Sequence, residues 1–338
     1  MNKNNVFFQQ DRVLIINDSV FKTKIVKPNS IDLVVTSPPY NVDIQYNSHN
    51  DKISYEQYKE FSEKWMSRCY DWLKDGGRFC LNIPLDKNKG GQQSVGADLT
   101  RIAKEVVGFK YHSTIIWNEG NISRRTAWGS WMSPSAPFVI APVELIVVLY
   151  KRDWKRPPQG RETDIIRQNF IDWTNGLWTF NGEKRNKIGH PAPFPVELPR
   201  RCMQLFSYVG DTVLDPFLGS GTSLIASYLY SRNGIGIEID PRYCQIALDR
   251  LRAEAGIDLT NTKKSSTKTQ SDIILQYFKD RPSESMNNKD VGEWIKEEVE
   301  KGSFKDIKAY EKIMRTLAKD GEIRKIAPGI FMYGGRSG

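Results

Sequence analysis

The sequence has few of the residues that build metal centres and disulfide bonds. Its 338 residues include four cysteines and three histidines. No two cysteines form a Cys-x-x-Cys pair or another metal-ligand spacing, and three histidines are too few for a His-based catalytic cluster. We therefore predict buried free thiols and no metal site.

Long apolar runs are also missing. The most apolar stretch, residues 138–150, is interrupted by Pro142 and Glu144 and is too short to span a bilayer, so it is typical of a buried strand. Residues 1–10 are polar and lack the apolar core of a signal peptide. We expect a soluble, intracellular protein that does not bind membranes.

Positive charge, in contrast, is abundant. Lys and Arg number 49 against 40 Asp and Glu, which gives a net charge of +9, and 39% of the residues are hydrophobic. The hydrophobic content is typical of a packed globular protein and excludes a mostly disordered one. The basic balance favours a polyanionic partner such as nucleic acid, although many basic proteins bind none.

Short apolar runs alternate with helical patterns over much of the chain. Strands are expected at residues 12–17, 31–36, 78–83, 112–117, 142–150, 213–214 and 234–239. Helices are expected at residues 55–74, 100–107 and 222–231. This alternation predicts an α/β fold with a mixed, mostly parallel sheet and helices on both faces.

Composition divides the chain into three parts. Residues 1–255 form the expected main domain, with an irregular, basic surface insertion at about 151–187, and residues 256–271 form a polar linker. Residues 272–338 resemble a small winged-helix domain, with helices at 273–279, 291–299 and 306–318 and a hairpin at 322–333. An unrelated helical protein-interaction domain is the alternative.

A glycine-rich loop follows the strand at 213–214 and opens a helix. Its residues are Asp215, Pro216, Phe217, Leu218, Gly219, Ser220, Gly221 and Thr222. Glycines in such a loop let a ligand approach the backbone, and the helix N-terminus offers free N–H groups. Taken alone, the loop also suits a nucleotide or a plain tight turn.

The strand after this loop adds a carboxylate. Glu238 lies 19 residues beyond Gly219, at a position where a carboxylate can accept hydrogen bonds from both ribose hydroxyls of a cofactor. The loop contains no basic residue, so a pyrophosphate is a less natural ligand. S-adenosylmethionine, which has a ribose and no phosphate, fits better.

A second motif, Ser37-Pro38-Pro39-Tyr40, ends the strand at 31–36. Ligands of open α/β sheets bind at such strand ends. The two prolines fix φ and remove two N–H donors, which leaves the Ser37 hydroxyl and the Pro38 carbonyl as rigid acceptors beside the aromatic ring of Tyr40. This pattern favours binding of an amino group in the plane of a base over an ordinary Pro-Pro turn, once it is combined with the glycine-rich loop.

Together the two motifs resemble the amino-group DNA methyltransferases, whose signatures are a (D/N/S)PP(Y/F/W) tetrapeptide and an FxGxG loop. The tetrapeptide precedes the loop by 178 residues, an order similar to the β group of these enzymes and to the site-specific cytosine-N4 methyltransferases of restriction–modification systems. The resemblance covers about residues 10–255 and includes Gly-His-Pro-Ala-Pro-Phe-Pro at 189–195.

The resemblance implies a chemistry and partners. S-adenosyl-L-methionine would be the cofactor and double-stranded DNA the partner, in the cytoplasm of a prokaryotic cell, and a companion restriction endonuclease is allowed but not required. The target base would be flipped out of the duplex. Ser37 and Pro38 would accept hydrogen bonds from its amine, Pro39 would stiffen the turn, and Tyr40 would stack on the base.

The resemblance also assigns cofactor contacts. Glu238 would bind the ribose, Asp215 the ammonium, and the backbone of the loop the methionine portion. Asp18 is a candidate for the adenine amino group or a helix N-cap, and His190 for the cofactor carboxylate or a loop cap. The full expected set is Asp18, His190, Asp215, Pro216, Phe217, Gly219, Ser220, Gly221, Thr222, Glu238 and Ile239.

Two basic stretches are candidates for DNA contacts. Arg124 and Arg125 lie among aromatic residues after a strand end, a composition that suits phosphate contacts and support of a flipped base. A solvated loop with buried tryptophans is the alternative. Lys151, Arg152, Lys155 and Arg156 lie in the insertion, where this family usually places its target-recognition region.

The identity of the target base is a matter of family pattern. Serine at the first position of the tetrapeptide favours cytosine N4, because enzymes that methylate adenine N6 more often carry Asp or Asn there. Adenine N6 is the first alternative, and RNA or a protein amide is the second. A catalytically silent DNA-binding regulator is an alternative of another class.

Overall fold

The computed structural model divides the chain into two compact units, residues 1–259 and 260–338. It describes residues 5–40, 53–86, 93–120, 129–130, 132–137, 139, 143–183 and 194–257 of the first unit. In the second unit it describes residues 286–287, 293, 323–327 and 330–333.

The first unit is built on a nine-stranded sheet with the order β1-β2-β9-β8-β3-β4-β6-β5-β7. The strands are β1 (Val6–Gln10), β2 (Val13–Asn17), β3 (Ile31–Thr36), β4 (Leu73–Pro84), β5 (Lys110–Asn118), β6 (Val143–Tyr150), β7 (Leu177–Thr179), β8 (Thr212–Asp215) and β9 (Asn233–Glu238). Strands β1 and β6 are antiparallel to their neighbours, and the other seven share one direction. The expected mixed, mostly parallel sheet is therefore confirmed.

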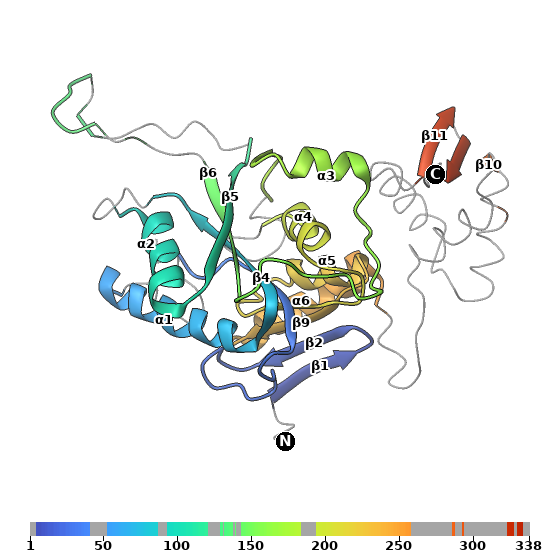
Figure 1. Cartoon of the computed structure of the whole chain (residues 1–338), viewed down its shortest axis with the longest axis horizontal. Coiled ribbons are helices and arrows are strands. Elements are labelled where there is room, and N and C mark those ends of the chain that lie inside the picture. Colours follow the sequence, from blue (N-terminus) through green and yellow to red (C-terminus); the bar gives the residue numbers. More distant parts are fainter. Residues whose placement is uncertain are drawn as a thin grey trace. The chain divides into compact units, whose positions relative to one another are not determined.

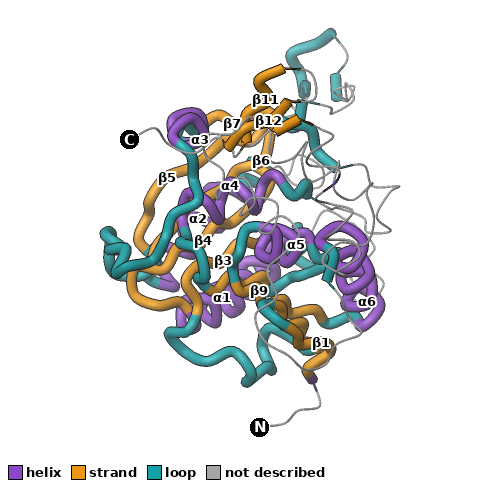
Figure 2. Tube along the Cα trace, turned by 90° about the vertical axis from the view of Figure 1, so that its right-hand side faces the viewer, coloured by secondary structure: helices purple, strands orange, loops and turns teal. Residues whose placement is uncertain are grey.

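Helices cover both faces of this sheet (Figure 1). They are α1 (Tyr55–Trp72), α2 (Val95–Arg101) with its π-helical continuation η2 (Ile102–Val107), α3 (Arg167–Trp173), α4 (Glu197–Phe206), α5 (Thr222–Leu229) and α6 (Pro241–Arg250), which is followed by the π-helix η4 (Leu251–Ala255). Figure 2 shows α5 and α6 next to each other, beside β9 and β1.

The two faces have separate apolar cores. Trp65 of α1 packs with Val34 and Leu81 on one face. On the other face, Leu198 of α4 packs with Leu33 and Val148. Alternate residues of the central strands thus point to opposite faces and are buried on both, as expected for parallel strands covered by helices.

The segment at 151–187 differs from the expected irregular surface insertion. It contains α3 and β7, and β7 extends the sheet in parallel with β5. Trp173 and Trp178 are 5% and 1% exposed, and both pack in the core beneath α4. The guanidinium of Arg201 lies over both tryptophan rings, at 5.2 Å from each centroid. Trp173 and Trp178 of this stretch therefore belong to the core of the fold, where Arg201 of α4 packs over them.

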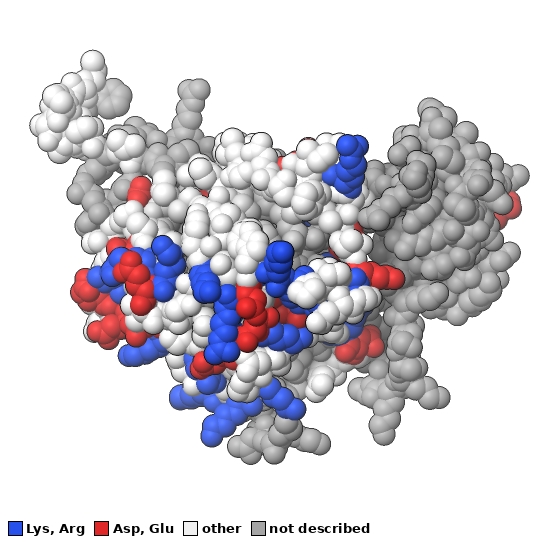
Figure 3. Space-filling view, in the orientation of Figure 1, with Lys and Arg blue, Asp and Glu red and all other residues white. Residues whose placement is uncertain are grey.

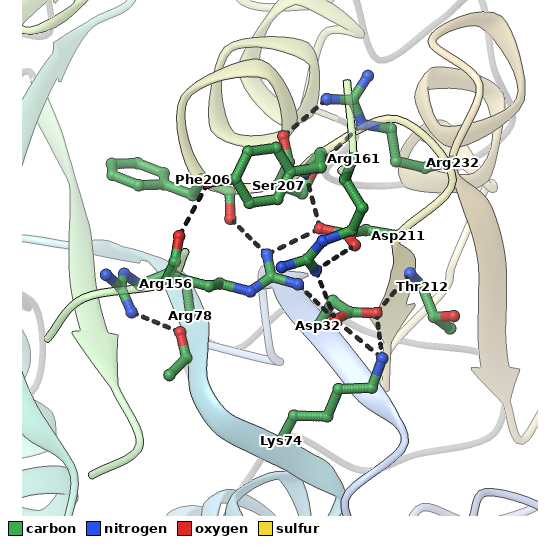
Figure 4. Close-up of polar contacts among 12 residues, drawn as sticks. Asp32, Lys74, Arg78, Arg156, Arg161, Phe206, Ser207, Asp211, Thr212 and Arg232 are labelled. Carbon is green, nitrogen blue, oxygen red and sulfur yellow. Dashed lines mark hydrogen bonds and ion pairs between the residues drawn. The ribbon is translucent and has the colours of Figure 1, made fainter. Parts of the chain in front are cut away.

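A buried charge cluster lies where β3 and β8 begin (Figure 4). Arg156 pairs with both Asp32 and Asp211, the latter at 2.7 Å, and Arg161 pairs with Asp211 at 3.0 Å. Lys74 donates to Asp32 at 2.8 Å. Asp32 and Asp211 are 2% and 4% exposed, so each carboxylate needs these cations to balance its buried charge.

Surface charge on the face drawn in Figure 3 is mixed. Lys and Arg alternate with Asp and Glu over the lower half of this view, and the described residues above them are mostly uncharged. On this face, the excess of positive charge does not gather into one basic patch among the described residues.

In the second unit the structure describes a three-stranded antiparallel sheet with the order β10-β12-β11. Its strands are β10 (Met286–Asn287), β11 (Ile323–Ala327) and β12 (Ile330–Tyr333), so the expected hairpin is confirmed. The expected linker and the three expected helices lie almost wholly outside the described residues, and the winged helix stays a prediction. None of the described helices is long and apolar enough to cross a membrane.

Candidate active site

The two sequence motifs meet at one edge of the sheet. We call the edge where the seven co-directional strands end the carboxyl edge. Ser37 follows β3, the glycine-rich loop (residues 215–222) begins at the end of β8, and Glu238 ends β9. Because β9, β8 and β3 are neighbours in the sheet, motifs that are far apart in the chain lie side by side.

Asp215 ties the two motifs together. Its Oδ1 accepts hydrogen bonds from Thr36 Oγ1 at 2.9 Å and from Phe217 N at 3.1 Å, and its Oδ2 accepts from Ser223 Oγ at 2.6 Å. Burial raises the pKa of this carboxyl to about 6, against the opposing effect of the three hydrogen bonds. With 1% exposure and both oxygens engaged, Asp215 is placed to hold the loop against β3. The expected contact with the cofactor ammonium stays a prediction.

The glycine-rich loop packs directly on α6. Gly219 and Gly221 have φ values of +51° and +83°, in the left-handed region that favours glycine. A Cβ on Gly221 would lie 2.7 Å from Ala247 Cβ and 2.9 Å from Ala247 Cα, closer than any side chain can be accommodated. The glycine at 221 is therefore required by the approach of α6 as well as by its backbone conformation.

Arg250 of α6, which the sequence analysis did not single out, braces the same loop. Its Nη1 donates to the Ser220 carbonyl at 2.9 Å, to Ser220 Oγ at 3.0 Å and to Thr222 Oγ1 at 3.0 Å. A basic residue in an ordinary helical pattern carries no local signal of this role, because its partners lie about 30 residues earlier in the chain.

Glu238 is partly buried beside the loop. Its Oε2 accepts from Gly219 N at 2.9 Å and its Oε1 from Asp240 N at 2.9 Å. Burial raises the pKa of its carboxyl, and the backbone hydrogen bonds oppose that shift. The carboxylate is thereby oriented by the backbone at the carboxyl edge, and Ile239 follows it with 56% of its surface exposed.

Asp18 lies next to Glu238, since its backbone N donates to the Glu238 carbonyl at 3.1 Å. Its own carboxylate accepts from Ser19 N at 2.7 Å and from Asn5 Nδ2 at 2.8 Å. The first of these bonds is typical of a turn residue, and the position beside Glu238 suits a cofactor contact. The adenine contact stays a prediction, and His190 lies outside the described residues.

The tetrapeptide is joined to a polar cluster that the sequence analysis missed. Ser37 Oγ and Tyr40 Oη are 2.5 Å apart, and Tyr40 Oη is 3.2 Å from Glu144 Oε2. Asn82 Nδ2 donates to Tyr40 Oη at 3.0 Å and to Glu144 Oε2 at 2.5 Å. We call Ser37, Tyr40, Asn82 and Glu144 the tetrapeptide cluster. Pro38 is buried, and Ser37, Pro39 and Tyr40 are half-buried.

Glu144 is the ionisable carboxyl of this cluster. Desolvation and, after it, the charge of Glu119 raise its pKa to about 7, against the opposing effect of hydrogen bonds from Asn82 and Tyr40. The signal in the sequence was the charge itself, because Glu144 interrupts the most apolar stretch of the chain.

Two of the residues expected to contact DNA have internal roles instead. Lys151 is 4% exposed, and its Nζ donates to Asn29 Oδ1 at 2.9 Å and to the Leu73 carbonyl at 2.8 Å. Arg156 belongs to the buried charge cluster. The expectation that these two side chains contact DNA is therefore wrong, because both are engaged by internal partners.

The whole stretch that carries them lies at the edge of the sheet opposite Ser37. Residue Tyr150, which ends β6, pairs with Arg78 near the start of β4, so residues 151–156 leave the sheet opposite the carboxyl edge. Arg152 and Lys155 are exposed there, and Arg152 pairs with Asp75 at 3.1 Å. A strand as long as β3 spans roughly 20 Å, which separates these residues from Ser37.

Two other segments begin at the carboxyl edge, and the first of them also ends there. Asn118 at the end of β5 pairs with Val143 at the start of β6, so residues 119–142 leave and return there. Residues 180–193 follow β7, which ends beside Asn118. Arg124 and Arg125 belong to the first segment and His190 to the second, although all three lie outside the described residues.

The residues of the carboxyl edge fit S-adenosylmethionine. The glycine-rich loop supplies backbone groups where only glycine fits, and Glu238 supplies a carboxylate for ribose hydroxyls. The loop itself has no basic residue for a phosphate, and the neighbouring Arg250 is engaged by Ser220 and Thr222. No group of three or more metal-binding side chains is found among the described residues. The fold and this site define a methyltransferase that uses S-adenosylmethionine and acts on an amino group.

Comparison with known proteins gives the family. The N6/N4 methyltransferase model, described as DNA methylase, matches residues 31–249. The chain therefore belongs to the N6/N4 family of DNA methylases, and it is an S-adenosylmethionine-dependent DNA amino-methyltransferase of the restriction–modification type.

Two similar proteins support this assignment, and a third shares the fold. The type II methyltransferase M.MjaVI of Methanocaldococcus jannaschii is 59% identical over 177 residues, which cover 52% of this chain and 89% of that protein. TTHA0409 of Thermus thermophilus, provisionally named a DNA modification methylase and solved with S-adenosyl-L-methionine, is 25% identical with a TM-score of 0.55, over 72% of this chain and 95% of that one. PvuII DNA methyltransferase (cytosine-N4-specific) shares the fold, with 20% identity and a TM-score of 0.56 over 74% of this chain and 88% of that one.

Proposed function

We propose that the protein transfers a methyl group to N4 of a cytosine that is flipped out of duplex DNA at a specific site, and that it protects DNA from a restriction endonuclease. The observation that carries this proposal is the placement of the Ser37 hydroxyl at the carboxyl edge, next to the loop that Asp215 fixes through Thr36. Adenine N6 is the alternative.

The chemistry follows from the acceptors of the tetrapeptide. Ser37 Oγ and the Pro38 carbonyl would accept hydrogen bonds from the exocyclic amine and draw its lone pair out of conjugation with the ring. When bound, S-adenosylmethionine supplies the electrophilic methyl group. The chain contributes position and electrostatics, because the amine is held in line with that methyl group. Tyr40 would offer ring surface to the flipped base, since its side chain is only partly buried.

The cysteines support transfer to an amine over chemistry through a protein thiolate. All four are buried, and desolvation raises the pKa of Cys69, Cys80 and Cys244 above the usual range. A thiolate is the nucleophilic form of cysteine, so burial suppresses a covalent route. Ser, Asp and Asn can all accept a bond from an amine, so the choice of cytosine rests on the family pattern at Ser37.

Nucleoside analysis tests the target base. Unmethylated plasmid DNA incubated with the protein and S-adenosylmethionine should yield N4-methylcytosine after digestion to nucleosides, and sequencing should place it at one recurring site. Recovery of N6-methyladenine alone would show that the base assignment is wrong. Binding of DNA with no methylated nucleoside would favour the silent regulator.

We also propose that DNA lies along the carboxyl edge and is contacted from residues 119–142. Alanine at both Arg124 and Arg125 should weaken DNA binding and lower the slope of log K against log salt by about 2, because each phosphate contact contributes about one unit. Alanine at both Arg152 and Lys155, which lie at the opposite edge, is the matched control and should leave the slope unchanged. A loss of slope in the control pair alone would place DNA at the other edge.

A further inference from the structure

We propose that Glu144 is the final acceptor of the proton that the target amine loses on methylation, and that the hydroxyls of Ser37 and Tyr40 relay this proton. The inference rests on the proposed contact between Ser37 and the amine. It assigns a role to a carboxylate that lies 107 positions beyond Ser37 in the chain and belongs to neither sequence motif.

The hydrogen bonds of the tetrapeptide cluster allow a relay that runs from Ser37 through Tyr40 to Glu144. Tyr40 has one hydroxyl proton, and Asn82 Nδ2 donates to its oxygen at 3.0 Å. If Ser37 also donates to that oxygen across 2.5 Å, the Tyr40 proton can point to Glu144 Oε2 at 3.2 Å or to the Asn82 carbonyl at 3.3 Å. An ionised carboxylate is the stronger acceptor of the two. The lone pairs of Ser37 Oγ then remain to accept the amine N–H.

The reaction requires a proton acceptor. A primary amine that gains a methyl group must lose one proton to end as a neutral secondary amine, while the sulfonium becomes a neutral thioether. In the relay, the amine N–H proton moves to Ser37 Oγ, the Ser37 proton moves to Tyr40 Oη, and the Tyr40 proton moves to the Glu144 carboxylate. Both hydroxyls end neutral, and Glu144 later releases the proton to water.

Glu144 is suited both to accepting the proton from Tyr40 and to releasing it to water afterwards. The groups that face it are Tyr40 after β3, Asn82 on β4 and Glu119 after β5. Desolvation and the charge of Glu119 raise its pKa to about 7, and a base with a pKa near the working pH both accepts and releases a proton readily. Asn82 is 2% exposed and neutral, so it orients Tyr40 and Glu144 without taking the proton.

Asn82 carries a further sign that this cluster is incomplete without its substrate. Its Oδ1 is buried and has no hydrogen-bond partner among the described residues. An unpaired buried acceptor costs stability, and such groups persist where a ligand or a function requires them. An acceptor next to Tyr40 is placed to receive an N–H group.

The variant that tests the proposal is Glu144→Gln, which keeps the shape of the side chain and removes the base. With enzyme in excess over plasmid DNA, the methyl-transfer rate of the wild type should rise with pH through about 7, because Glu144 must be ionised to accept the proton. Glu144→Gln should be about 100-fold slower at high pH and should lose this pH dependence.

Two further variants keep the test decisive if Glu144→Gln folds poorly. Tyr40→Phe retains the ring but interrupts the relay, so it should also abolish the pH dependence, and the double variant should be no slower than the slower single one. Glu119→Gln removes the charge that raises the Glu144 pKa, so the rise in rate should shift to lower pH with an unchanged plateau.

Melting temperature and S-adenosylmethionine affinity, measured for every variant, separate folding from the proton transfer. A wild-type pH dependence retained by Glu144→Gln or by Tyr40→Phe would overturn the relay, and so would an unshifted profile in Glu119→Gln. The base identified in the wild-type product tests the proposed function separately, because the relay predicts the same pH profiles for either amine.

Discussion

Alanine in place of Ser37 should slow methyl transfer by about 100- to 1,000-fold and leave the affinity for S-adenosylmethionine nearly unchanged. The substitution removes the acceptor that would hold the amine out of conjugation, and it also removes the first member of the tetrapeptide cluster. The cofactor loop is held by Asp215 and Arg250 instead, neither of which depends on Ser37. Single-turnover rates and calorimetric titration with the cofactor give the two quantities.

Ser30→Ala is the matched control for this experiment. Ser30 immediately precedes β3, whereas Ser37 immediately follows it, and the Ser30 hydroxyl donates to the Lys27 carbonyl at the opposite edge of the sheet. The same hydroxyl group is removed at the other end of β3, yet methyl transfer should continue at the wild-type rate. A near-normal rate in Ser37→Ala would exclude Ser37 from the mechanism.

Alanine in place of Asp32 should lower the free energy of unfolding by about 3–5 kcal/mol. Asp32 accepts from Arg156 and Lys74 and from Thr212 N at 2.9 Å, and the Arg156 side chain is 11% exposed. Without Asp32, the buried guanidinium keeps Asp211 alone to balance it, and a main-chain N–H loses its acceptor. Urea unfolding followed by circular dichroism measures the change, provided that the slope with urea is unaltered.

The control for Asp32 is Asp75→Ala, which removes an exposed ion pair near the same edge. Asp75 and Arg152 are 45% and 65% exposed and 3.1 Å apart, so the loss should stay within about 1 kcal/mol. An Asp32 variant no less stable than the Asp75 variant would mean that the buried cluster contributes little to stability.

The strands of the sheet could be predicted from the sequence because burial on both faces leaves continuous apolar runs. β3 and β6 follow that pattern. The boundary between α1 and β4 was predicted about two residues late, because Leu73 is helical in pattern but pairs with Ile31 in an extended conformation. β1 was missed, since Val6–Gln10 alternates only weakly and pairs at the edge of the sheet.

The wrong predictions for site residues have a common cause. The role of a charged side chain depends on its partner, and that partner can lie far away in the sequence. Arg156 and Lys151 were predicted to lie on the surface because their neighbours are basic and polar, yet their partners lie in distant segments. Glu144 was taken only as an interruption of an apolar run, although a charge in a buried strand calls for a function or a partner. The two motifs were found because their backbone requirements, two prolines and two left-handed glycines, are local.

The bond between Thr36 and Asp215 has a consequence for protein synthesis. The strand that carries the tetrapeptide is among the first to leave the ribosome, but its neighbour β8 and the α6 residues that brace the glycine-rich loop follow about 180 to 210 residues later. A chain that is truncated before α6 therefore carries the tetrapeptide without a place for the methyl donor. Incomplete translation products should therefore not methylate DNA. The pairing of β3 with β8 closes a long loop, so it should form late in folding.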